Sequence, residues 1–207
     1  MLRVIARLGI AILLLGAAAG PATAASPHQL DPAQMIPPLN PDFGPWICTD
    51  TGQGAVCRGE NDDTWTGVDI GLACDGQPIY GTGWYTSEGV RWHLPDGRAL
   101  HTYFKNASIE TWTLSADGSG RTVTVKGSWN EHYVYPVPGD INQRVLTITG
   151  ADWQATAKGV GVVFHDTGLL RFNPGPDNGI ELTHGPTDSD HGNLDLVLDD
   201  ICAALGA

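Results

Sequence analysis

The sequence predicts an all-β fold, in which an antiparallel meander forms a sandwich or a barrel-like body with a short C-terminal helix and two disulfides. Short runs rich in Val, Ile, Thr, Tyr and Trp recur along the chain, and Gly, Pro, Asp and Asn punctuate them. Turns separate these runs about every eight to twelve residues, which favours neighbouring antiparallel strands. No amphipathic helical pattern interrupts the middle of the chain. Alternating strands are common to sandwiches and barrels, so the sequence leaves both open.

The first 24 residues have the pattern of a secretory signal peptide. Arg3 and Arg7 precede an apolar run over residues 8–20, and Ala22-Thr23-Ala24 fits a cleavage site. The run is shorter than the ~20 residues that a spanning helix needs, so we expect no transmembrane anchor. The predicted location is secreted, either extracellular or in the cell envelope.

Residues 25–45 follow as a proline-rich segment, and residues 46–207 form a single β domain. Six prolines between positions 27 and 45 interrupt any helix or strand pattern. Proline fixes its own φ and restricts the preceding residue, so this segment is expected to be extended.

The four cysteines all lie after the predicted cleavage site, which indicates two disulfides. Three pairings are open, and we favour Cys48–Cys57 with Cys74–Cys202. Glycines at 52 and 54 allow the chain to reverse between the first two cysteines. The second bond would then tie the end of the chain to the body of the domain.

The middle of the chain has sequence patterns that predict strands and turns. Val123 and Val125 alternate with polar residues as strand residues do. Turns are predicted at residues 95–97, 116–120 and 166–168. Near the end, apolar residues at helical spacing predict a helix over residues 194–205.

Several segments carry a resemblance: TGQGAVCRG, VRWHLPDGR, TWTLSADGSGRTVTVKG, VYPVPGD and ATAKGVGVVFHDTG. They resemble an uncharacterised family of secreted actinobacterial proteins with no assigned activity. The similarity covers most of residues 46–205. It implies export from a bacterial cell and transfers no functional residues.

Charge excludes one class of partner. The chain has 23 acidic and 11 basic residues and a net charge of −12. Such a surface repels nucleic acid, so no nucleic-acid function is expected.

Two polar segments are candidates for a metal site. His165 ends an apolar run, and a loop with two histidines and two aspartates begins at His184. Imidazole and carboxylate groups bind zinc, and the aspartates alone would suit calcium. The candidate ligands are His165, His184, His191, Asp188 and Asp190.

No catalytic residue is predicted. The carboxylates that would suit glycoside hydrolysis are Glu60, Asp62, Asp63, Glu88, Glu110 and Glu131, and their spacing selects no pair. Aromatic residues mark a candidate ligand surface, namely Tyr133, Tyr135, Trp84 and Trp92.

The predicted function is a binding or interaction module for an extracellular ligand or envelope component. The alternatives are a metal-assisted secreted hydrolase and a carbohydrate-binding module. The carbohydrate-binding alternative would use exposed Trp84, Trp92 or Trp153, whereas Tyr133 and Tyr135 suit a general recognition surface. Trp112 is expected to lie in the core.

Overall fold

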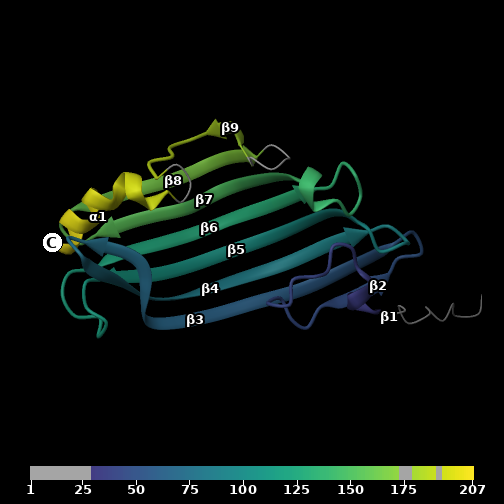
Figure 1. Ribbon diagram of the computed structural model, residues 1–207, viewed down its shortest axis with the longest axis horizontal. Helices are drawn as coiled ribbons and strands as arrows, with labels where there is room; N and C mark the ends of the chain where they lie inside the picture. Colours follow the sequence, from purple (N-terminus) through teal and green to yellow (C-terminus); the bar gives the residue numbers. More distant parts are fainter. Residues whose placement is uncertain (1–28, 173–178, 190–192) are drawn as a thin grey trace, which may run out of the picture.

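The computed structural model describes residues 29–172, 179–189 and 193–207. Within them the chain forms one nine-stranded antiparallel sheet whose strands follow sequence order (Figure 1). The strands are β1 (Gln29–Leu30), β2 (Ile47–Asp50), β3 (Ala55–Cys74), β4 (Gln77–His93), β5 (Ala99–Thr113), β6 (Val123–Val134), β7 (Val145–Ala157), β8 (Gly161–Phe172) and β9 (Ile180–His184). Helix α1 (Leu198–Leu205) follows, and short 3-10 turns lie at Pro32–Gln34, Ile141–Gln143 and Leu194–Val197.

The sheet curves, so that it has a concave face and an outer face. Helix α1 contacts β3, β6 and β8, and β3 lies five strands away from β8. One short helix reaches both strands only because the sheet bends around it, and Figure 1 shows the end of β3 sweeping toward α1. Successive side chains of each strand point alternately to the two faces.

A hydrophobic core fills the concave face at the α1 end. Ile79, Trp112, Val123 and Phe164 from four strands pack against Ile201 of the helix. Burial of such side chains stabilises a fold by about 1.5–3 kcal/mol each. The predicted core position of Trp112 is confirmed, since it is 1% exposed.

Helix α1 presents an apolar side to this core and an acidic side to solvent. Ile201, Ala204 and Leu205 are buried, whereas Asp199 and Asp200 are exposed in the first turn, where carboxylates interact favourably with the helix dipole. Gly206 ends the helix with φ 87°, and its N–H donates to the carbonyls of Cys202 and Ala203.

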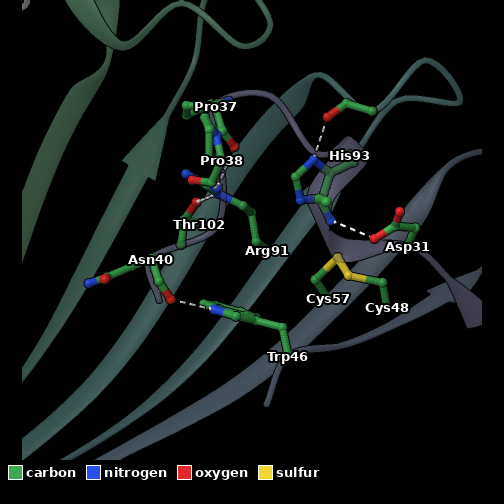
Figure 2. Close-up of a disulfide and its surroundings, with 12 residues drawn as sticks. Asp31, Pro37, Pro38, Asn40, Trp46, Cys48, Cys57, Arg91, His93 and Thr102 are labelled. Carbon is green, nitrogen blue, oxygen red and sulfur yellow. Dashed lines mark hydrogen bonds between the residues drawn. A yellow bond between two sulfur atoms is a disulfide. The ribbon is translucent and has the colours of Figure 1, made fainter. Parts of the chain in front are cut away.

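The proline-rich segment covers the other end of the concave face. Met35 and Phe43 are 4% and 6% exposed. Arg91 of β4 donates to the carbonyls of Pro37 (3.0 Å) and Pro38 (3.2 Å), as Figure 2 shows. The same guanidinium donates to Thr102 Oγ1 at 3.0 Å. One buried cation therefore fastens this segment to β4 and β5.

Both predicted disulfides are confirmed. Cys48 and Cys57 lie directly opposite each other on β2 and β3, so their bond clips a hairpin (Figure 2). Cys74 at the end of β3 is bonded to Cys202 of α1 across 128 positions of sequence. The antiparallel meander and the C-terminal helix are confirmed as well.

The turn predicted at residues 166–168 is wrong, because β8 runs without a break through these residues. Gly168 has φ 124°, and a Cβ there would meet the carbonyl oxygen of His184. Glycine stands here because the chain around β9 approaches closely, and not because β8 reverses.

Among the described residues, no helix is long and apolar enough to span a membrane.

Candidate functional site

A pocket lies on the concave face between the α1 core and the proline-rich segment, and we call it the central pocket. Its volume is about 310 Å³. Five adjacent strands, β3 to β7, supply its lining, which consists of Asp63, Trp65, Tyr85, Ser108, Glu110, Val125, Trp129, Asp152 and Trp153.

The strand register explains why these side chains meet. Gly83 pairs with Trp65 on one side and Glu110 on the other, so the three residues form one row across β3, β4 and β5. In the next row, Tyr85 lies between Asp63 and Ser108. Residues paired in this way project to the same face of a sheet. The lining is therefore fixed by the meander itself and not by a loop.

A hydrogen-bond network holds one wall of the central pocket. Glu131 Oε1 accepts from Trp129 Nε1 at 3.0 Å and from Asn106 Nδ2 at 3.2 Å, and Glu131 Oε2 accepts from the Tyr133 hydroxyl at 2.8 Å. The Tyr85 hydroxyl donates to Asn106 Oδ1 at 2.8 Å. These bonds fix the ring planes of Trp129 and Tyr85, whose centroids lie 6.1 Å apart.

The lining is acidic and contains no basic side chain. Asp63, Glu110 and Asp152 line the pocket, and its lining set includes no Lys, Arg or His. Burial, followed by the negative charges of Glu131 and Asp166, raises the pKa of Asp152 to about 6. The pocket thus gathers three carboxylates, one of which, Asp152, is partly buried.

The aromatic candidates named from the sequence separate onto the two faces. Tyr133 lies on the concave face and binds Glu131, and Tyr135 is 4% exposed with its hydroxyl 3.2 Å from Arg91 Nη2. Trp84 and Trp92 project from alternate positions of β4 to the outer face, where Trp84 is 38% exposed. The four residues therefore do not form one surface.

The predicted metal ligands are only partly described. The backbone N–H of His165 donates to Asp188 Oδ2 at 2.9 Å, and His184 is exposed at the end of β9. Asp190 and His191 lie outside the described residues. In the part of the chain that the structure describes, no three or more His, Cys, Asp or Glu residues gather as a metal site. The loop site stays a prediction.

The central pocket combines residues that sequence reasoning did not bring together. Asp63 and Glu110 were among the carboxylates whose spacing selected no pair, and Trp65 and Trp129 carried no functional assignment. The usable signal is the alternation within each strand, which puts Asp63 with Trp65, and Trp129 with Glu131, on one face. The register between strands was the missing information.

No family model matches the chain, and searches of curated proteins and of solved structures likewise find no match. The chemistry of the central pocket is therefore the guide to function.

Proposed function

We propose that this chain is an exported binding protein whose central pocket takes a small organic cation. The observation that carries the proposal is the pairing of three indole rings with three carboxylates in one cavity that has no basic lining residue. Trp65, Trp129 and Trp153 all line the cavity. A cation over a tryptophan face gains about 0.5–1 kcal/mol at an exposed site and about 2 kcal/mol when it is desolvated.

The charge of the pocket supports a cationic ligand over a neutral one. Asp152 has a raised pKa because its negative charge is buried near other negative charges. A positive ligand would relieve that repulsion, whereas a neutral ligand would bury the carboxylates further without compensation.

The hydrogen-bonding groups favour a cation over a sugar. Carbohydrate hydroxyls both donate and accept, so a sugar site needs donors as well as acceptors. Three donors of the lining are already used in hydrogen bonds within the protein. The indole N–H of Trp65 donates to Glu110, and that of Trp129 donates to Glu131. The Tyr85 hydroxyl donates to Asn106. The lining carboxylates are hydrogen-bond acceptors, which suits the N–H or polarised C–H groups of an ammonium ion.

The volume and the compartment fit this role. A cavity of about 310 Å³ is at the small end of the usual ligand-site range of about 300–1,000 Å³. The two disulfides suit an oxidising compartment, and the N-terminal pattern predicts export there. The resemblance to secreted actinobacterial proteins agrees with the same location.

The test compares ligands that differ only in charge. Choline and its neutral isostere 3,3-dimethylbutan-1-ol are titrated separately, and glucose serves as a sugar probe. The readout is the chemical shift of the indole N–H signals of Trp65 and Trp129. We expect choline to bind at least tenfold more tightly than the isostere, a difference of about 1.4 kcal/mol. Equal binding of choline and the isostere, or tighter binding of glucose, would contradict the proposal.

A pair of variants locates the binding. Glu110→Gln removes one lining charge and should weaken choline binding about tenfold. Glu60→Gln removes an exposed charge from the same acidic protein but outside the pocket lining, and should leave the affinity within twofold. If both variants weaken binding equally, the effect is the overall charge of the protein and the assigned site is wrong.

A further inference from the structure

We propose a second site, on the outer face, at which the imidazoles of His101 and His132 bind one divalent transition-metal ion. The two histidines lie on the neighbouring strands β5 and β6. The register pairs Tyr103 with His132 and His101 with Val134, so the histidines are diagonal neighbours on one face. This face is opposite the central pocket, and the inference does not depend on the proposed function.

The separation of the rings fits chelation. The ring centroids of His101 and His132 lie 6.0 Å apart, with 40° between the planes. Given metal–nitrogen bonds of about 2.1 Å, each centroid of a chelating imidazole lies about 3.2 Å from the ion. Two such centroids are then roughly 4.5 Å apart when the nitrogen–metal–nitrogen angle is 90° and roughly 6.4 Å apart when it is 180°. The observed separation falls inside this range.

The surroundings hold one ring in place and leave room for an ion. The Trp92 and His101 rings meet edge to face with centroids 5.0 Å apart, which restricts the His101 ring. Both histidines line a cavity of about 510 Å³ with Trp92, Tyr103, Asn130, Thr147 and Thr149. The Tyr103 hydroxyl donates to Asn130 Oδ1 at 2.7 Å, which fixes that amide beside the pair. The Asn130 side-chain oxygen and the hydroxyls of Thr147 and Thr149 can accept hydrogen bonds from water molecules that complete the coordination of the ion.

The type of ligand selects the class of ion. Imidazole suits zinc, copper and nickel, so the ion is of this class rather than calcium or magnesium.

The first experiment titrates the untagged protein with Zn²⁺ by calorimetry. We expect one bound ion per chain, and at least a tenfold loss of affinity in His101→Asn and in His132→Asn. His165→Asn and His184→Asn are the matched controls, because they remove histidines of the predicted loop site, and should change the affinity less than twofold. Binding that survives both outer-face substitutions, or that is lost in a control variant, would overturn the proposal.

A spectroscopic experiment identifies the ligands without relying on variants. Electron paramagnetic resonance of the protein loaded with one equivalent of Cu²⁺ should show hyperfine coupling to two imidazole nitrogens. The same spectrum of His132→Asn should lose one of these couplings. A wild-type spectrum with a single imidazole or none would rule out the paired site.

Discussion

The indole N–H of Trp65 donates a hydrogen bond of 2.9 Å to Glu110 Oε1 across an intervening strand. Trp65 is on β3 and Glu110 on β5, and the β4 residue between them is Gly83. Two strand spacings amount to roughly 9–10 Å, so the indole must pass over β4 to reach the carboxylate. It can do so because Gly83 has no side chain in the way.

Gly83→Ala is therefore expected to open this contact. A Cβ at Gly83 would lie 2.8 Å from Glu110 Cα, which is closer than such atoms approach. We expect destabilisation of about 1–3 kcal/mol from overpacking, measured by urea unfolding, and at least a tenfold loss of choline affinity. Gly179→Ala is the control, since a Cβ there meets nothing within 4 Å. Retention of full choline affinity in Gly83→Ala would show that the row formed by Trp65, Gly83 and Glu110 is not part of the binding site.

Ionisation of Asp152 should lower the free energy of unfolding of the protein as the pH rises above the pKa of this carboxyl group. Its pKa rises from 3.8 to about 6 on folding, so between these values the folded state holds a proton that the unfolded state has lost. The contribution of Asp152 to stability is full below pH 3.8 and is lost as the pH rises through 6. The loss is on the order of 3 kcal/mol.

Asp152→Asn has no such titration. The free energy of unfolding of the variant minus that of the wild type should therefore increase by up to about 3 kcal/mol from pH 4 to pH 7.5. Urea unfolding at the two pH values measures this change. A difference between the two proteins that does not vary with pH would show that Asp152 titrates normally.

The hydroxyl of Tyr133 should matter more than that of Tyr103. Tyr133 OH donates to the carboxylate Glu131 Oε2 at 2.8 Å inside the concave face, and burial, followed by the charge of Glu131, raises its pKa. Hydrogen bonds to charged groups contribute about 1.5–3 kcal/mol. Tyr133→Phe should cost that much in urea unfolding. Tyr103→Phe loses an exposed hydroxyl bond to Asn130 and should cost less than ~1 kcal/mol. The reverse order would contradict the assigned network.

The two disulfides should differ in their effect on stability. The Cys74–Cys202 bond closes a loop across 128 positions and the Cys48–Cys57 bond one across 9. In the chain-entropy model these bonds stabilise by about 5 and about 3 kcal/mol. Thermal unfolding of Cys74→Ala/Cys202→Ala and of Cys48→Ala/Cys57→Ala compares them directly. A larger loss in the second double variant would mean that native contacts, and not loop length, set the difference.

The fold class was predictable because it follows from local signals. Alternation at Val123 and Val125 marked a strand, and glycines 52 and 54 with their flanking cysteines marked a clipped hairpin. Strand β3 gave a weaker signal, since Glu60 to Asp63 are poor strand formers by propensity. Continuous pairing with β4 from Ala55 to Trp65 overrides that propensity, and such pairing is a property of two segments rather than one.

The central pocket was not predictable for the same reason. Trp65, Glu110 and Trp129 are up to 64 positions apart in sequence, and only the register of four successive strands puts them on one face. A slip of one residue in any pairing would move a wall of the pocket to the outer face. The paired histidines at 101 and 132 went unnoticed for the same reason, because their adjacency depends on the β5–β6 register.

A crystal structure with arsenocholine tests the central claim most directly, because the arsenic atom locates the cation by its anomalous scattering. The account predicts one strong peak in the central pocket, within about 6 Å of the ring centroids of Trp65, Trp129 or Trp153. A peak elsewhere on the protein, with the central pocket holding only solvent at a saturating concentration, would contradict it.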